Sequence, residues 1–161
     1  MKKYGKMLSK YIGRTNNWMC KASEVSKVII NKCLSRGFSL TAPKLQKLLV
    51  VMQGKCLSEH DKELFKEEVL AWSCGVAVKE VNSDFKNYDF KNSKGLQAYV
   101  VLLDYEDKII DEVLDKFGDK DAITISADYR LSKLVKMFYE EGKSNIIPKN
   151  IIKDIFADDL Y

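Results

Sequence analysis

The sequence predicts a mainly α-helical protein, with a single compact helical domain and a small β element. Apolar residues recur at three- and four-residue intervals along most of the chain, and there are only two prolines. At 161 residues, with 46% apolar and 31% charged residues, the chain is long enough to bury one core. No run approaches the roughly 18 apolar residues of a membrane-spanning helix. We therefore expect one cytoplasmic domain.

Two helices are predicted before residue 60. The first covers residues 23–36, with Ser23 as its N-cap and Gly37 as its end. Thr41 caps the second, whose first turn tolerates Pro43. The core-facing positions of the two helices are Val25, Val28, Ile29, Cys33, Leu45, Leu48, Leu49, Met52 and Cys56. Gly54 costs the second helix about 1 kcal/mol relative to alanine, which indicates close helix packing or an early end.

The next segment has an ambiguous pattern. Over residues 63–74, Glu68 and Trp72 share a face if the segment is helical. A short helix follows Gly75, with Val78, Val81 and Phe85 as its apolar positions. The run LQAYVVLL over residues 96–103 is rich in β-branched residues and follows Gly95, so it predicts a strand. We expect it to pair with residues 122–125.

Three helices are predicted in the C-terminal third. Asp104 caps the first, which ends at Gly118; Ser126 opens the second, which ends at Gly142; Pro148 begins the last. Their inward-facing residues are Ile109, Ile110, Val113, Leu114, Phe117, Leu131, Leu134, Val135, Phe138, Ile151, Ile152, Ile155 and Phe156.

The charge is concentrated at the N-terminus. Residues 1–21 hold six basic residues and no acidic one, although the whole chain carries only +4. We therefore divide the chain into a basic arm, residues 1–21, and a helical domain, residues 22–161. The arm is a solvated tail or an amphipathic segment that offers lysines such as Lys6 and Lys10 to an acidic partner. Nucleic acid is a weaker candidate, because so few charges support only non-specific attraction.

Residues that commonly carry catalysis or bind metal are sparse. The single histidine, His60, lies in a polar stretch, and Cys20, Cys33, Cys56 and Cys74 form no Cys-x-x-Cys pair. Cys33 and Cys56 fall on apolar stripes, which indicates buried thiols. No glycine-rich phosphate-binding motif occurs. We predict no catalytic residue, no metal site, no cofactor and no enzymatic activity.

Residues 44–81 contain a recognisable series of motifs. The run Lys44-Leu45-Gln46-Lys47-Leu48-Leu49 precedes Gln53-Gly54, then Leu64-Phe65 with Glu67 or Glu68, and then Ala71, Trp72 and Gly75. This series resembles the Panacea antitoxin domain, also described as SocA-like or phage-associated GepA-like. The likeness covers roughly residues 22–157. Two departures are Val76, where the family has proline, and Val135-Lys136, where threonine and histidine are usual.

The resemblance implies an antitoxin that neutralises a protein toxin by direct contact or delivers it to a protease. The toxin is then expected to be encoded nearby. Two alternatives are an inhibitor of a host defence enzyme, encoded by a phage or mobile element, and a DNA-binding regulator that uses the basic arm.

Four residues of the motif series are candidate partner contacts in addition to Lys6 and Lys10. Lys44 and Lys47 are expected to be more exposed than the leucines beside them, so they could meet an acidic partner. Structural support is the alternative for both. Trp72, beside Gly75, is either an aromatic anchor at an interface or a buried core residue.

Overall fold

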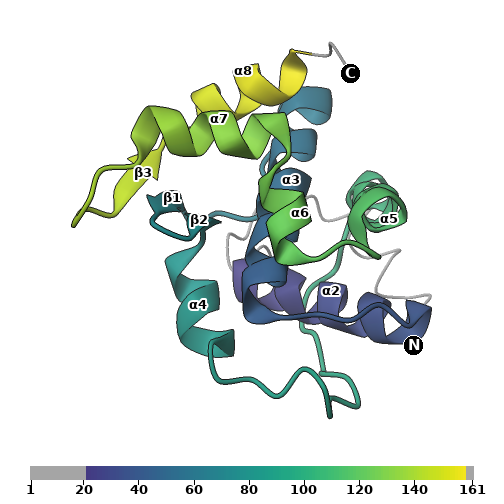
Figure 1. Cartoon of the computed structure of the whole chain (residues 1–161). Helices are drawn as coiled ribbons and strands as arrows, with labels where there is room; N and C mark the ends of the chain where they lie inside the picture. The colour runs from purple at the N-terminus through teal and green to yellow at the C-terminus, as the bar shows by residue number, and fades with distance from the viewer. Residues whose placement is uncertain (1–20, 159–161) are drawn as a thin grey trace.

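The computed structural model describes residues 21–158, which form seven helices and three strands. In chain order the elements are α2 (Ala22–Arg36), α3 (Ala42–His60), β1 (Val69–Trp72), β2 (Gly75–Ala77), α4 (Lys79–Phe85), α5 (Asp104–Phe117), α6 (Ala122–Ser126), α7 (Tyr129–Phe138), β3 (Asn145–Ile147) and α8 (Lys149–Ala157). The predicted class, mainly α and compact with a small β element, is confirmed. Six other helices and the sheet are arranged around α3 (Figure 1).

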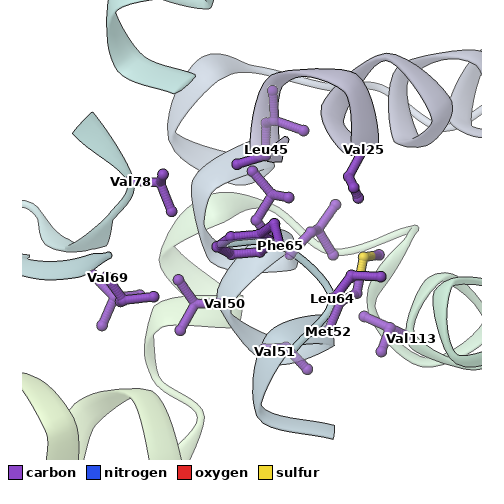
Figure 2. Packing of buried hydrophobic residues seen from close by; sticks show 14 of the residues in the cluster. Val25, Leu45, Val50, Val51, Met52, Leu64, Phe65, Val69, Val78 and Val113 are labelled. Carbon is purple, nitrogen blue, oxygen red and sulfur yellow. The ribbon is translucent and has the colours of Figure 1, made fainter. Parts of the chain in front are cut away.

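Helix α3 is the central element of the core. All of its residues from Lys44 to Gly54 are buried, so the helix is enclosed on every side rather than along one stripe. Side chains from α2, from residues 64 and 65, from the sheet and from α5 pack against it (Figure 2). Because α3 is enclosed, its polar side chains must find hydrogen-bond partners inside the protein.

The first two helix starts differ in their capping groups. Thr41 Oγ1 accepts a hydrogen bond from the Lys44 N–H at 3.2 Å, so the predicted cap of α3 is confirmed. Helix α2 begins one residue earlier than predicted, and Ser23 is not its cap. Gly37 ends α2 in the left-handed conformation, at φ 72°, as expected.

The β element lies elsewhere than the sequence predicts. Strand β1 pairs antiparallel with β2 on one side, where Trp72 opposes Gly75, and with β3 on the other, where Leu70 opposes Ile146. The predicted pairing of residues 96–103 with 122–125 is wrong: residues 96–103 form no regular helix or strand, and residues 122–125 belong to helix α6. In α6, Asp121 caps the helix and outweighs the β-propensity of the isoleucines.

The C-terminal boundaries also need correction. Asp104 is the first residue of α5 and not its cap; instead, the N–H of Leu103 donates to the Glu106 carboxylate at 2.7 Å. Ser126 ends α6, and Asp128 caps α7, which stops at Phe138, well before Gly142. Pro148 precedes α8 as predicted.

Candidate functional site

The two motif lysines are buried, contrary to the exposure expected from the sequence. Lys44 is 4% exposed and Lys47 is 2% exposed. The Lys44 ammonium donates hydrogen bonds to the carbonyl oxygens of Ser39 and Gly118, both at 2.6 Å. Burial lowers the pKa of Lys44, and the carboxylates of Asp119 and Asp121 partly oppose this effect. Lys44 therefore joins the end of α5 to the loop before α3.

Gln46 and Lys47 hold the chain where β2 leads into α4. The Gln46 side-chain amide accepts a hydrogen bond from the Val78 N–H at 2.8 Å and donates one to the Val78 carbonyl at 3.1 Å. Lys47 Nζ donates to the Val76 carbonyl at 3.0 Å. Burial also lowers the pKa of Lys47. These contacts attach the sheet to the central helix.

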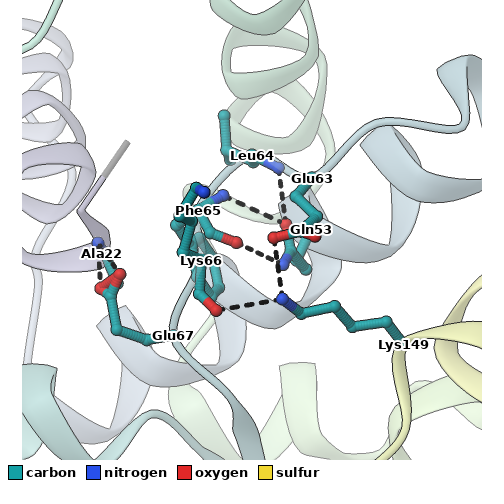
Figure 3. A network of polar contacts seen from close by, with 8 residues as sticks. All are labelled: Ala22, Gln53, Glu63, Leu64, Phe65, Lys66, Glu67 and Lys149. Carbon is teal, nitrogen blue, oxygen red and sulfur yellow. Dashed lines mark hydrogen bonds and ion pairs between the residues drawn. The ribbon is translucent and has the colours of Figure 1, made fainter. Parts of the chain in front are cut away.

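Gln53 has a similar role nearer the C-terminal end of α3 (Figure 3). Its oxygen accepts from the N–H of Leu64 at 2.7 Å and of Phe65 at 3.4 Å, and its nitrogen donates to the Phe65 carbonyl at 2.9 Å. Both residues are fully buried, so their backbone groups have no access to water. Gln53 thus supplies hydrogen-bond partners to the backbone groups of a buried loop that carries two core side chains.

Glu67, and not Glu68, has the structural role in this loop. Its carboxylate accepts the N–H of Ala22 at 2.7 and 3.1 Å, so it caps α2 from a distant part of the sequence (Figure 3). Lys149 of α8 donates to the Glu63 carboxylate at 2.8 Å and to the Lys66 carbonyl at 3.0 Å. Residues 63–67 therefore connect α2, α3 and α8.

Lys47, Trp72 and Gly75 come together at the β1–β2 hairpin. Gly75 has a φ of 114°, and a Cβ there would lie 3.0 Å from Lys47 Nζ, so both backbone conformation and space favour glycine. Trp72 lies opposite Gly75 in the strand register and is half-buried. Its indole Nε1 is the one buried side-chain polar atom without a hydrogen-bond partner within residues 21–158.

An open groove runs from this hairpin to the turn between α7 and β3. We call it the hairpin groove; its lining residues are Trp72, Ser73, Cys74, Tyr139, Glu141, Gly142, Lys143 and Ser144. Its volume is about 470 Å³. Cys74 is exposed at its edge, whereas Cys33 and Cys56 are buried, and burial raises the pKa of the Cys33 thiol. The sequence analysis identified Trp72 as a candidate but did not identify the second wall.

Exposed apolar side chains occur on α7 and β3, the two elements that the groove-lining turn connects. Met137 and Ile146 are each about half exposed, and Tyr139 is exposed at the end of α7. Ile146 opposes Leu70 in the register, which places it on the same face of the sheet as Trp72. Because aromatic residues and methionine are enriched at protein interfaces, this composition is typical of a protein-binding surface. In the sequence, the run KMFY over residues 136–139 was the feature that could have indicated this apolar surface.

The remaining predictions concern His60, metal binding, membrane-spanning helices and the lysines of the basic arm. His60 is the last residue of α3, and its ring lies 4.1 Å from the ring of Tyr105. Within residues 21–158, no group of three or more His, Cys, Asp or Glu side chains is arranged to hold a metal ion. No helix in this same range is long and apolar enough to cross a membrane. Lys6 and Lys10 lie outside the described residues.

No protein-family model, curated protein or solved structure matches this chain. The resemblance to the Panacea domain therefore rests on the motif residues themselves. In this structure, three polar members of that series, Gln46, Gln53 and Glu67, each bond to backbone groups of another segment.

Proposed function

We propose that this chain is a non-enzymatic, antitoxin-like protein of the cytoplasm that neutralises a protein toxin by binding it directly. The observation that carries the proposal is the hairpin groove, which is lined by Tyr139, together with the exposed Met137 of α7 and Ile146 of β3, the elements on either side of the groove-lining turn. The resemblance of residues 44–81 to an antitoxin domain supports the same conclusion.

The buried motif residues direct attention to this surface. Lys44 and Lys47 hold backbone carbonyl groups inside the protein, so they are structural residues in the folded chain. A partner has to be recognised by side chains that solvent can reach, and the hairpin groove gathers such side chains from two segments far apart in sequence. Trp72 is the one motif residue that lines it.

The groove has the chemistry of an interface centre. Tryptophan and tyrosine are frequent among the residues that dominate binding energy, and they act best in pockets from which water is excluded. A volume of about 470 Å³ can accept one or two large side chains of a partner. Trp72 contributes its ring to the wall of the groove, whereas its indole N–H is buried without a hydrogen-bond partner in the described part of the free protein.

The experiment is co-expression with the product of the neighbouring gene, followed by affinity capture and a growth assay. We expect a stable complex and rescue of growth where that product is toxic. The double variant Met137→Asp/Ile146→Asp should weaken capture at least tenfold, because it places two charges on the exposed apolar positions of α7 and β3. Ile123→Asp on α6 is the matched control, since Ile123 is more exposed than either residue and lies outside the groove.

Two outcomes would contradict the proposal. These are no complex with the neighbouring product while both proteins are folded, or equal loss of binding in the Ile123 control. Delivery to a protease would use the same contact and is distinguished by the toxin's lifetime, which shortens only when an adaptor acts.

Cys74 provides a second, chemical test of the same surface. In a Cys20→Ser variant, a bulky maleimide should react with Cys74 first, because Cys33 and Cys56 are buried. The label should block complex formation without changing the melting temperature. A labelled protein that binds as tightly as the unlabelled one would place the contact surface elsewhere.

A further inference from the structure

An open groove lies where the start of α2, the loop before β1 and helix α4 meet. We call it the α4 groove; its lining includes Lys21, Lys66, Glu67, Glu80, Ser83 and Asp84. Helices α2 and α4 pack against each other beside it (Figure 1). Its volume is about 640 Å³, which is larger than that of the hairpin groove. Carbon atoms of the long side chains form most of its surface, so the groove can take up apolar groups as well as charged ones.

Helix α4 contributes two carboxylates without partners to this groove. Glu80 and Asp84 are four positions apart, so they lie on the same face of α4, and both are exposed. Neither side chain forms a hydrogen bond or an ion pair within residues 21–158. Like charges at this spacing repel each other. A cation placed between the two carboxylates therefore relieves this repulsion.

The basic arm joins the folded domain at the edge of the α4 groove. Lys21, the last residue of the arm, lines the groove. Residues 1–20 contain five basic residues, no acidic one and several large apolar side chains, among them Trp18. An extended chain advances at most about 3.6 Å per residue, so Trp18 lies within about 11 Å of Lys21 and Arg14 within about 25 Å. Both the composition of the arm and its point of attachment match the groove.

We propose that the basic arm docks in the α4 groove of its own chain, with Arg14 at the carboxylates of Glu80 and Asp84 and the Trp18 ring on the carbon surface of the groove. A guanidinium group has five N–H donors, enough to serve both carboxylates. A short tether gives an effective concentration of about millimolar, so the arm of the same chain is favoured over that of a second copy at micromolar protein. Docking covers one face of α4 and neutralises the positive charge of the arm.

The α4 groove shares no lining residue with the hairpin groove, so the inference does not depend on the proposed function. Exposed ion pairs are individually weak and are screened by salt. The docked arm is therefore expected to be released reversibly as the salt concentration rises. The arm of a second copy is the competing occupant, and the experiments below distinguish it.

Fluorescence of Trp18 measures docking in the full chain. A Trp72→Phe background leaves Trp18 as the single tryptophan. We expect acrylamide to quench Trp18 at least twofold less efficiently in about 20 mM salt than in about 500 mM salt, because salt screens the attraction between the arm and the groove. In the same background, Glu80→Lys/Asp84→Lys should raise quenching at low salt to the high-salt level.

Asp154→Lys/Asp158→Lys is the matched control for this charge reversal. These two acidic residues have the same spacing at the end of α8, both are exposed, and their replacement changes the net charge equally. The control should quench like the background chain. Quenching that is independent of salt and of the reversal on α4, or that rises equally in the control, would overturn the proposal.

Cysteine cross-linking identifies which copy supplies the arm. In a Cys20→Ser/Cys74→Ser chain, Thr15→Cys/Ser83→Cys should form a disulfide within one chain on mild oxidation at micromolar concentration. Thr15 is next to Arg14, and Ser83 lines the groove. Electrophoresis without reductant separates this product from a dimer linked between chains. A disulfide found only between chains would assign the groove to the arm of a second copy and overturn the proposal.

Thr15→Cys/Tyr99→Cys in the same chain is the matched control. The Tyr99 N–H donates to Glu24 in the first turn of α2, so Tyr99 also lies near the attachment point of the arm, but it does not line the groove. We expect the control to oxidise at least fivefold more slowly. Equal rates for the two variants would show that the arm is not held in the groove. Circular dichroism confirms that each variant is folded.

Discussion

Gly54 of α3 lies directly against the aromatic ring of Phe156 in α8. A Cβ placed on Gly54 would come within 2.4 Å of Phe156 Cγ and within 2.6 Å of both Cδ atoms. This contact allows α8 to approach α3 closely near the C-terminal end of α3 (Figure 1). Of the two interpretations that the sequence left open for Gly54, close helix packing is the one confirmed.

Gly54→Ala should therefore destabilise the protein, although alanine favours a helix by about 1 kcal/mol. We expect a net loss of roughly 2 kcal/mol, since the extra methyl group forces the Phe156 ring or the whole of α8 to move. Urea unfolding measures the change. Adding Phe156→Leu should recover part of the loss, so the two substitutions should be non-additive. Additive effects would show that the two residues are not coupled.

Gln53→Ala should cost roughly 3 kcal/mol of unfolding free energy. The substitution leaves the N–H and carbonyl groups of Leu64 and Phe65 buried without partners. Gln97→Ala is the control, because Gln97 is exposed and its loss should stay within about 0.5 kcal/mol. Chemical denaturation of both variants gives the comparison, and equal losses would contradict the role assigned to Gln53.

Glu67→Ala and Glu68→Ala form a matched pair at adjacent positions. Loss of Glu67 removes the cap on α2, and we expect a cost of about 1 kcal/mol together with faster amide exchange in the first turn of that helix. Glu68 is exposed, so its loss should be close to neutral. Thermal unfolding and hydrogen exchange provide the measurements. A larger effect at Glu68 would contradict the assignment of the cap to Glu67.

Lys47 should make stability increase with pH above neutrality. Burial lowers its pKa in the folded state below the ordinary value of 10.5, so the unfolded chain binds this proton more tightly. Its contribution to the unfolding free energy then rises as the pH passes from the lowered pKa towards 10.5. Accordingly, the difference between wild type and Lys47→Met should shift in favour of wild type between pH 7 and pH 10.

Lys32 is the control for this measurement. Partial burial lowers the pKa of Lys32, but its contacts with Asp111 and Asp107 outweigh that effect and raise the pKa overall. Its stabilising contribution is fully present below 10.5 and is lost only above that value. The difference between wild type and Lys32→Met should therefore stay flat from pH 7 to pH 10. If the two differences changed with pH in the same way, the opposite directions assigned to the pKa shifts of Lys47 and Lys32 would be contradicted.

Trp72→Phe removes the indole N–H but keeps an aromatic ring, so it distinguishes the contribution of the N–H from that of the ring. We expect the unfolding free energy to change by less than about 1 kcal/mol, because removing an unpaired buried donor offsets the smaller ring. Affinity for the partner should fall by about five- to thirtyfold if binding moves the ring so that an acceptor of the partner reaches this N–H. Calorimetric titration of the complex gives this value. Unchanged affinity, together with unchanged stability, would leave Trp72 without a polar role in binding.

The sequence by itself determined the helical class, the ends of the best-capped helices and most of the core. Thr41, Gly37 and Pro148 act through local geometry, which requires only neighbouring residues. Apolar periodicity likewise identified Leu45, Leu48, Leu49 and Met52 as core positions. The residues of the hairpin groove were only partly found, because Trp72 and Tyr139 lie on segments that are brought together by folding.

Tertiary structure decided the strand partners and the roles of the polar motif residues. Residues 96–103 have strand propensity, yet a sheet also needs a partner edge, and β1 pairs instead with β2 and β3. The helical register of the sequence predicts that Lys44 and Lys47 are more exposed than the leucines beside them. They are buried because α3 is enclosed on all sides, where carbonyl groups of distant segments compensate for the loss of water.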